Sequence, residues 1–566
     1  MYIQNAVVKN FRNFENLTIT MSPLTILVGE NDAGKSNFLY AISLPLFGSS
    51  PDFNHKRLSI SDINNRCIRK YYAAVSAGKS DDDCKKLIPR VSVTLQFNDT
   101  KDDYELAIVS KWLVDNNGAP AYEVEYNFKP RNEEDFLATT KILLKGQDAE
   151  KIGFLSFPIE LYEYEIVSPN NGKNIPQADL KHVIVSNIGA ERDSFAESTM
   201  SRSNNLLTKI LLSSLQEEEK KSINFAYGEF FAAIKDAKIF GTVFKFDDAF
   251  ENISKYFDDL HCIPNLPNLR NIISNITLGY GEQFLYQKGL GERNMVLIFL
   301  LFAYYKTTHK SYNLCCIEEP EAHLSVNNLR LTVDYIEKSS TLVGGLLQTI
   351  VSTHNPSIIN KLSIKNVVVF SGGKAISLSS ASEELQNYLA KRPNFDILKL
   401  LFSRRTILVE GPTEEMLINT FLGADSGKLS DIEVIAIGQK GFRTFLDIWL
   451  HLNEGNADKK IGIVRDFDNQ QNAKNEHDAY EIKHANIVVR TTQGYTLEDD
   501  LASHPGNSKA LAAALGQVDD ANSIADFMKS AKTDWMLTAC NYIADPEAKH
   551  QITLPAHIEQ IIASLS

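Results

Sequence analysis

Apolar and polar positions alternate along the first thirty residues of the chain. Polar residues separate the apolar side chains of Val8, Phe11, Phe14, Leu17 and Ile19, and this alternating run predicts strands. A continuous apolar run at 26–28 follows and leads into a glycine-bearing segment. Beyond that segment the period changes, and Phe38, Leu39 and Ile42 form one face of a helix. The pattern therefore predicts a strand, a loop and a helix in immediate succession.

Further strands and helices follow along the chain. Alternation at 91–97 and an apolar run at 182–186 predict strands, whereas the periodicity becomes helical from about 194 to 260. The longest apolar run, at 295–305, is about half of the ~20 residues that a membrane-spanning helix requires. We therefore expect a buried helix there and no membrane as a partner.

Short apolar runs bounded by polar residues predict the buried strands of parallel sheets. They occur at 314–317, 349–352, 406–409, 434–437 and 461–464. The character of the chain changes near residue 385, and 393–395 is typical of a linker. Because strands alternate with helical segments, the predicted fold class is α/β. At ~100–200 residues per domain, the length of 566 residues predicts two to four domains.

The segment between the first predicted strands and helix matches a phosphate-binding loop. Its spacing is Gly29-x4-Gly34-Lys35-Ser36, in the strand–loop–helix setting that this motif requires. The glycines let backbone N–H groups surround phosphate oxygens, the lysine pairs with the β- and γ-phosphates, and the serine supplies an oxygen to Mg²⁺. We therefore expect ATP as a cofactor. The residues predicted to hold it are Gly29, Asn31, Gly34, Lys35, Ser36 and Asn37.

Three later segments suit the same nucleotide site. A loop with Gly289 and Gly291 precedes the long apolar run, although two such glycines alone are a weak signal. Glu318 and Glu319 end a buried strand, where α/β sheets bind ligands. One of these carboxylates can hold Mg²⁺ through water while its neighbour polarises the attacking water. The next buried strand leads to His354, which can reach the γ-phosphate.

A second group of carboxylates follows the buried strands of the last third of the chain. Glu410 ends one strand, Glu414 lies on the helix after it, and Asp466 and Asp468 end a third strand. A period of two places both aspartates on the same side, and a parallel sheet aligns Glu410 beside them. Converging carboxylates suit Mg²⁺ or Mn²⁺, and two such ions ~3.5–4 Å apart serve phosphodiester cleavage. The alternative is four solvated strand-end acids.

Composition bounds the class of protein. The net charge is −13, which argues mildly against a nucleic-acid binder, although divalent cations would neutralise a clustered share of the acids. Six cysteines without metal-binding spacing suit a reducing compartment. The first residues lack the pattern of a secretory signal peptide. We therefore expect a cytoplasmic protein.

The nucleotide motifs resemble, in the same order, those of the ATP-binding-cassette (ABC) ATPases of chromosome maintenance and double-strand-break repair. The resemblance implies that Glu318 is the metal-side acid, Glu319 the catalytic base and His354 the γ-phosphate sensor. It also implies two heads that sandwich two nucleotides, with the glycine loop of one facing the phosphate loop of the other. Lys288 stands where larger relatives have serine, which departs from the pattern.

The second carboxylate group resembles the Toprim domain of topoisomerases, primases and related nucleases. An ABC-type ATPase followed by Toprim is the architecture of the overcoming-lysogenization-defect (OLD) family of ATP-dependent endonucleases, to which the nuclease of the Gabija anti-phage system also looks related. The resemblance implies an acidic segment at Thr496–Leu501, in which Glu498 either binds the second metal or caps a helix. It also implies a catalytic lysine, for which Lys532 is chosen and Lys529 is the alternative.

The resemblance divides the chain into four segments. Residues 1–165 are expected to form the first part of the ABC ATPase head, and 266–388 its second part. Between them, 166–265 is predicted to be a helical insertion that could serve as a dimerisation arm. Residues 389–566 are expected to form the Toprim nuclease domain, with a Rossmann-like parallel sheet.

These patterns predict an ATP-binding, metal-dependent DNA endonuclease whose ATPase gates cleavage, acting in anti-phage defence or DNA processing. DNA is the expected partner, together with a second copy in a homodimer or higher homo-oligomer, and a helicase or other defence-system protein is a further candidate. One alternative is a repair or chromosome-organising ATPase whose Toprim lobe binds DNA without cutting it. Another is a strand-passing topoisomerase or primase, for which no transesterifying tyrosine or nucleotidyl-transfer module declares itself.

Overall fold

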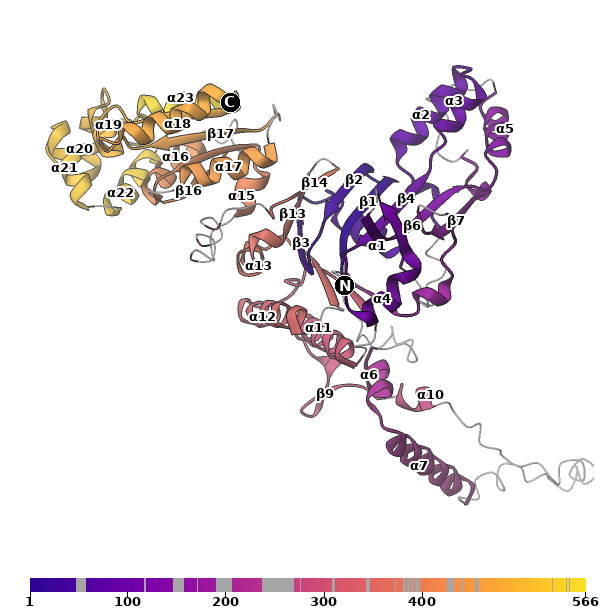
Figure 1. Cartoon of the computed structure of the whole chain (residues 1–566). Coiled ribbons are helices and arrows are strands. Elements are labelled where there is room, and N and C mark those ends of the chain that lie inside the picture. The colour runs from indigo at the N-terminus through magenta and orange to yellow at the C-terminus, as the bar shows by residue number, and fades with distance from the viewer. Residues whose placement is uncertain are drawn as a thin grey trace, which may run out of the picture. The chain divides into compact units, whose positions relative to one another are not determined.

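The computed structural model divides the chain into two compact units (Figure 1). The first comprises Met1–Thr353 and Asn366–Ser377, and the second His354–Lys365 and Leu378–Ser566. The residues that the structure describes are 1–46, 57–116, 119–145, 157–169, 172–189, 206–236, 269–274, 276–307, 311–342, 347–371, 373–379, 383, 387, 391, 397–424, 432–438, 441–453, 458–531, 533–545, 547–548 and 550–565.

An antiparallel sheet forms one part of the first unit. Its order is β2-β1-β4-β6-β5, and β7 also pairs with β6. The strands are β1 (Ile3–Phe11), β2 (Phe14–Thr20), β4 (Val91–Phe97), β5 (Leu113–Asn116), β6 (Ala119–Pro130) and β7 (Tyr162–Val167). Every second residue of β4 is buried, so this strand has one core face and one face of partly exposed residues. The alternation seen at 91–97 in the sequence has this cause.

The second sheet of the first unit is parallel except at one edge. Its order is β14-β13-β3-β12-β11-β8, and only β14 runs antiparallel to its neighbour. The strands are β3 (Leu24–Gly29), β8 (Val183–Ile188), β11 (Tyr312–Glu318), β12 (Leu347–Ser352), β13 (Val367–Ser371) and β14 (Lys374–Ser377). All six residues of β12 are buried, as expected for a central strand covered on both faces. The predicted α/β class is confirmed.

The buried side chain of Gln348 fastens the two sheets of the first unit together. Its amide donates to the carbonyl of Ile3 over 2.9 Å and its oxygen accepts from the N–H of Ile3 over 2.8 Å. The hydroxyl of Tyr312 donates to the same oxygen over 2.6 Å. Because a buried amide is costly without partners, these bonds fix β1 of the antiparallel sheet against β12 of the parallel one.

The first unit also contains helices, some of which pack on these sheets. They are α1 (Lys35–Ser43), α2 (Asn65–Ser76), α3 (Asp81–Lys86), α4 (Asp103–Val109), α5 (Glu133–Leu144), α6 (Leu206–Ser214), α7 (Glu217–Asp236), α10 (Leu269–Ile273), α11 (Leu290–Thr307) and α12 (Val326–Leu342). Helix α11 contains the long apolar run and packs on α6 and α12. Among the helices of the described residues, none is long and apolar enough to cross a bilayer.

The segment predicted as a helical insertion begins with sheet structure. Strand β8 pairs in parallel with β11, so residues 183–188 are part of the parallel sheet, and within the described part of the segment the first α-helix is α6. The strand predicted at 182–186 corresponds to β8. Residues 190–205 and 237–268 of this segment lie outside the described residues. Its use as a dimerisation arm stays a prediction.

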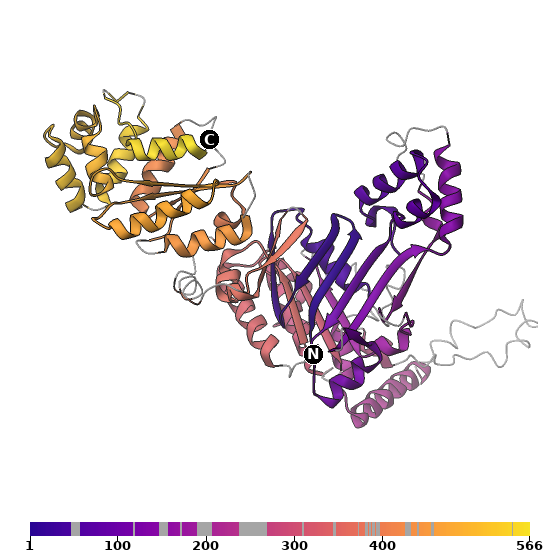
Figure 2. The same ribbon diagram turned by 45° about the horizontal axis from the view of Figure 1, so that its top comes forward.

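The second unit is built on a four-stranded parallel sheet of order β16-β15-β17-β18. The strands are β15 (Arg405–Val409), β16 (Ile432–Ala436), β17 (Lys460–Arg465) and β18 (Ile487–Thr491). The helices are α13 (Pro356–Lys361), α15 (Ile397–Phe402), α16 (Pro412–Ala424), α17 (Phe442–Asn453), α18 (Gln471–Lys483), α19 (Leu497–Ser503), α20 (Asn507–Leu515), α21 (Ala521–Ala531), α22 (Asp534–Ile543) and α23 (Ala556–Leu565). Figure 2 shows helices on both faces of this sheet.

One glycine of this sheet is required by packing. A Cβ atom at Gly462 in β17 would lie 2.6 Å from the Cδ1 atom of Ile561 in α23. A side chain there would push the last helix away from the sheet, because buried atoms cannot approach so closely. The glycine therefore brings α23 directly onto β17 and β18, where the helix packs in the structure.

Candidate functional site

The phosphate loop connects β3 to α1 with the geometry that the sequence predicts. Gly34 has a φ of 105°, and a Cβ atom there would lie 2.6 Å from the ring of Phe14, so both conformation and space require glycine. The ammonium of Lys35 folds back over the loop and donates to the carbonyls of Gly29 over 2.7 Å and Glu30 over 3.1 Å. Burial lowers the pKa of Lys35, and the carboxylates of the β11 strand end oppose that shift.

The paired acids lie against this loop. The hydroxyl of Ser36 donates to the carboxylate of Glu318, which brings together the two residues predicted to hold Mg²⁺. Glu319 follows with a φ of 45°, and its N–H donates to the carbonyl of Ser352 over 2.8 Å. This left-handed conformation turns the chain sharply at the end of β11. The charge of Glu319 is also the largest influence opposing the lowered pKa of Lys35, so the two residues lie close in space.

The two asparagines of the loop differ in their surroundings. Asn31 is exposed at the turn. Asn37, in contrast, accepts from Nη1 of Arg12 over 2.8 Å and donates to the side chain of Asn13 over 2.9 Å. In this structure the Asn37 amide therefore ties the loop to the turn between β1 and β2. Its contact with nucleotide stays a prediction.

The turn between β1 and β2 is a neighbour of the loop that the sequence reading missed. Arg12 bonds Asp62 over 2.9 Å, and its guanidinium lies 4.9 Å from the ring centre of Tyr40. Asn13 donates to the carbonyl of Ala33 within the loop over 3.2 Å. The sequence carried one signal of this turn, because the polar residues Arg12 and Asn13 lie between the buried Phe11 and Phe14. These residues support the loop from the side of the antiparallel sheet.

The glycine loop at the start of α11 packs against the turn that follows the paired acids. A Cβ atom at Gly291 would overlap the carbonyl oxygen of His323, and the side chain of Asn294 donates to the carbonyl of Ala322 over 3.2 Å. At Gly289 nothing lies within 4 Å of a Cβ position. The ammonium of Lys288 lies 4.9 Å from the ring centre of Tyr280. Gly291 thus has a packing role, and the nucleotide contacts of both glycines stay predictions.

The end of β12 is joined to the same turn. The hydroxyl of Thr353 donates to Oε1 of Glu321 over 2.6 Å. His354 follows Thr353 directly in the chain, but it belongs to the second unit. Its predicted approach to the γ-phosphate therefore stays a prediction.

The carboxyl ends of β15 and β17 bring two of the second group of carboxylates together. These strands are parallel neighbours, with Leu408 opposite Ile463, so the residues beyond each strand meet at one edge. The N–H of Asp466 donates to Oε1 of Glu410 over 3.2 Å. The alignment of Glu410 beside Asp466 follows from the register of the sheet, as the sequence predicts.

Asp468 reaches this edge by a different route from the one predicted. Strand β17 ends at Arg465, and Asp468 has a φ of 47°, so the two-residue alternation does not extend from Asp466 to Asp468. The prediction that a strand period aligns them was wrong. Instead the loop is held by its backbone, because the N–H of Phe467 donates to the hydroxyl of Thr492 over 2.9 Å. The N–H of Asp468 donates to the carbonyl of Tyr495 over 3.1 Å.

The electrostatics of this edge reflect several acids near one another, of which Glu414 is buried and the others are partly buried. Burial, followed by the charges of Glu414, Glu410, Glu498 and Asp468, raises the pKa of Asp466 to about 8. Burial also raises the pKa of Glu414 to about 7 and that of Glu410 above its ordinary value. Anionic side chains in such a place are destabilised unless a cation compensates them.

The donor set suits a hard divalent cation. Its carboxylate oxygens are the ligands that Mg²⁺ and Mn²⁺ prefer. Among the described residues, no three His, Cys, Asp or Glu side chains are already arranged around a common metal position. The residues therefore fit the ion by the chemistry of their oxygens and by the closeness of Glu410 to Asp466.

Family comparisons agree with this division of the chain. The sequence model of the AAA ATPase domain matches residues 1–359, which is more than half of the chain. The chain belongs to this family of ATPases. The model of the overcoming lysogenization defect protein-like TOPRIM domain matches residues 401–468. The chain thus combines an AAA ATPase domain with an OLD-like TOPRIM domain.

Two relatives of this ATPase–TOPRIM chain share most of its length. Endonuclease GajA from Bacillus cereus (strain HuB5-5) is 22% identical over 511 residues, which cover 76% of this chain and 72% of GajA. Old nuclease from Escherichia phage P2 is 24% identical over 464 residues, which cover 77% of this chain and 72% of Old. A solved SMC head bound to the C-winged helix domain of ScpA matches at 18% identity and a TM-score of 0.35, covering 68% of this chain and all of that one.

In the second unit, the acidic segment after β18 contains neighbouring residues with different partners. Thr496 and Asp499 form the capping box of α19, so Glu498 is not the capping residue. Asp499 also forms a 2.5 Å ion pair with Lys529 on α21. Lys532 lies outside the described residues, so its predicted role is not placed. Of the two candidate lysines, Lys529 has a described position beside the acidic segment.

Proposed function

We propose that this ATPase–TOPRIM protein is a DNA endonuclease that depends on Mg²⁺ or Mn²⁺ and is gated by ATP. The observation that carries the proposal is the carboxylate edge formed by Glu410, Glu414 and Asp466, in which the N–H of Asp466 bonds Glu410 and burial raises all three pKa values. The homology to endonuclease GajA and Old nuclease supports a nuclease, and DNA is the substrate we assign to it.

The residues assigned to the metal are Glu410, Glu414, Asp466, Asp468 and Glu498. When bound, the ions would polarise a phosphodiester and the water that attacks it. The fold contributes the position of these acids, because strand ends and backbone hydrogen bonds hold the Asp466–Asp468 loop. A lysine on or next to α21, Lys532 or Lys529, would stabilise the charge that develops on the phosphate.

In the ATPase domain, Lys35 is assigned to the phosphates of ATP, while Ser36 and Glu318 are assigned to its Mg²⁺. Glu319 is the proposed base and His354 the proposed γ-phosphate sensor. The contact between Ser36 and Glu318 and the proximity of Glu319 to Lys35 support this assignment. A cytoplasmic homodimer or higher oligomer, acting in anti-phage defence or DNA processing, is the proposed setting, with a helicase or other defence-system protein as a candidate partner.

A plasmid cleavage assay tests the proposal. Purified protein is incubated with supercoiled DNA, with and without Mg²⁺, Mn²⁺ and ATP, alongside Asp466→Ala and a control, Asp478→Ala. Asp478 is also an acid, but it lies on α18 in a surface pair with Lys474. We expect metal-dependent cleavage by the wild type and the control, and none by Asp466→Ala.

Cleavage without metal, or by Asp466→Ala at the wild-type rate, would refute the proposal. ATP hydrolysis without any cleavage would favour an ATPase whose TOPRIM lobe only binds DNA.

A further inference from the structure

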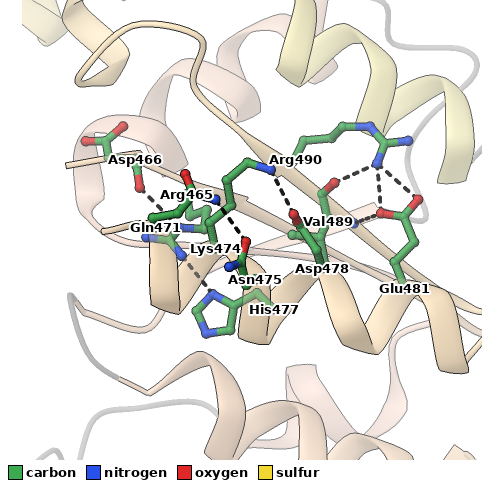
Figure 3. A network of polar contacts seen from close by, with 10 residues as sticks. All are labelled: Arg465, Asp466, Gln471, Lys474, Asn475, His477, Asp478, Glu481, Val489 and Arg490. Carbon is green, nitrogen blue, oxygen red and sulfur yellow. Dashed lines mark hydrogen bonds and ion pairs between the residues drawn. The ribbon is translucent and has the colours of Figure 1, made fainter. Parts of the chain in front are cut away.

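A buried arginine stands directly before the Asp466 loop. Arg465 is the last residue of β17 and is 3% exposed. Its Nε atom donates to the backbone carbonyl of Asp466 over 3.1 Å, and its Nη1 atom lies 3.3 Å from Nδ1 of His477 on α18 (Figure 3). Burying a charged guanidinium costs free energy unless hydrogen bonds compensate it. The hydrogen bonds of Arg465 supply this compensation and connect the side chain to the Asp466 loop.

The histidine in this contact must be neutral. Arginine can only donate hydrogen bonds, so Nδ1 of His477 accepts and the ring proton is on Nε2. Burial and the charge of Arg465 lower the pKa of His477, while Glu476 and Asp478 on the same helix oppose this shift. From α17, Arg443 pairs with Glu476 over 3.2 Å, and the ring of Phe442 lies edge-on to the imidazole at 5.4 Å.

The arginine donates one of the hydrogen bonds that fix the two peptide groups on either side of Asp466. On one side the N–H of Asp466 donates to Glu410, and on the other its carbonyl accepts from Arg465. The carbonyl of Arg465 itself accepts from the N–H of Thr492 over 3.0 Å. With both neighbouring peptides fixed, the direction in which the Asp466 side chain leaves the backbone is set. The charge of Arg465 also counters the raised pKa of Glu410.

We propose that the Arg465–His477 contact sets the position of the Asp466 carboxylate for metal binding, which makes both residues positioning residues of the nuclease site. This inference rests on the proposed function. Its physical reason is that losing a group that holds a metal ligand in place typically weakens metal binding by ~10- to 100-fold. Neither side chain is assigned to the metal or to DNA.

Three substitutions separate this role from simple packing. His477→Phe keeps an aromatic ring against Phe442 and removes the acceptor. His477→Asn removes the ring but keeps an oxygen acceptor close to the place of Nδ1. Arg465→Lys keeps the positive charge and loses the planar fork that reaches two acceptors at once. If the contact matters through its hydrogen bond, the asparagine variant is the conservative one.

Binding of Mn²⁺ to the full-length protein without nucleotide is measured by the electron paramagnetic resonance signal of free Mn²⁺, and plasmid cleavage is measured in parallel. We expect His477→Phe and Arg465→Lys to weaken Mn²⁺ binding by ~10-fold or more, and His477→Asn to restore most of it. Circular dichroism melts identify any variant that has lost its fold. If either His477→Phe or Arg465→Lys is unfolded, the Mn²⁺ binding of the other variant tests the proposal.

Two failures can be distinguished. If the wild type neither binds Mn²⁺ without nucleotide nor cuts DNA, the proposed function itself fails. If the wild type does both while a folded His477→Phe or Arg465→Lys binds Mn²⁺ equally well, only the positioning role is overturned. A loss in His477→Asn as large as in His477→Phe would also overturn it, because ring packing would then be the cause.

Discussion

The N–H of Asp466 donates a hydrogen bond of 3.2 Å to Oε1 of Glu410, which joins the ends of two neighbouring parallel strands. The two residues are far apart in the sequence and meet because β15 and β17 pair in parallel. This bond favours the ionised form of Glu410, whereas burial opposes it. Burial thus favours the neutral form of the acids at this strand-end edge, and a bound divalent cation would stabilise their charged form.

Two substitutions in the ATPase domain should have different effects. Lys35→Ala should lose ATP affinity, because the ammonium that lies over the loop is the group assigned to the phosphates. Glu319→Gln should bind ATP normally and hydrolyse it slowly, because removing a base leaves the phosphate loop intact. Fluorescent-nucleotide binding and phosphate release measure the two steps. Equal loss of binding in both variants would show that the roles are wrongly assigned.

A pair of glycines at the start of α11 offers a test of packing. In the interior of a helix, alanine is more favourable than glycine by about 1 kcal/mol. At Gly291 the added methyl group would overlap the carbonyl of His323, so Gly291→Ala should instead destabilise by about 1–3 kcal/mol. Gly289→Ala is the matched control, since its Cβ position meets nothing within 4 Å.

Hydrogen–deuterium exchange of peptides from α11 and from residues 319–324 measures this effect. We expect faster exchange in Gly291→Ala and unchanged exchange in Gly289→Ala. The same exchange in both variants would mean that the close approach of Gly291 to His323 does not hold in solution.

The elements that could be predicted from the sequence are those with a recognisable local pattern of residues. The phosphate loop has fixed spacing, and the buried strands are short apolar runs, so both could be read directly from the chain. The meeting of Glu410 and Asp466 was also predictable, because parallel strands bring their carboxyl ends to one edge. Each of these inferences needs only local pattern and the geometry of a sheet.

Other features depend on contacts that no local pattern encodes. The position of Asp468 depends on a left-handed turn and a bond to Tyr495, which an extended strand period cannot foresee. The capping of α19 by Asp499 rather than Glu498 depends on which of two adjacent acids turns back to Thr496. The partners of Asn37 come from a turn that precedes it in sequence and packs beside it in space.

The ion pair of Lys529 with Asp499 yields a prediction about the catalytic lysine. If this lysine also supplies positive charge to the site, Lys529→Met should slow cleavage by ~100-fold while Mn²⁺ binding is retained. The reason is that the lysine charge would stabilise the negative charge that develops on the phosphate in the transition state. Lys532→Met is assayed beside it, and Lys509→Met is the control because Lys509 is an exposed lysine on α20. Normal cleavage by Lys529→Met and slow cleavage by Lys532→Met would assign the role to Lys532.

Nucleotide control of cleavage should appear as a difference between two trapped states. Glu319→Gln with bound ATP and Lys35→Ala without it should cut the same plasmid at different rates at saturating ATP. A ligand shifts a conformational equilibrium only through its different affinities for the two states, and such coupling is typically ~1–3 kcal/mol, or ~5- to 150-fold. Free Mg²⁺ must be matched, so that chelation by ATP cannot mimic inhibition. Identical rates would mean that the two activities are independent.

The most direct test of the nuclease centre is the cleavage rate of Glu410→Gln in Mg²⁺ and in Mn²⁺. Glutamine keeps the shape of the side chain and an oxygen that can accept from the N–H of Asp466, but it removes the negative charge that a metal requires. We predict that this variant folds and binds ATP like the wild type and leaves supercoiled plasmid uncut. Cleavage by Glu410→Gln at the wild-type rate would contradict the assignment of the strand-end edge as the nuclease site.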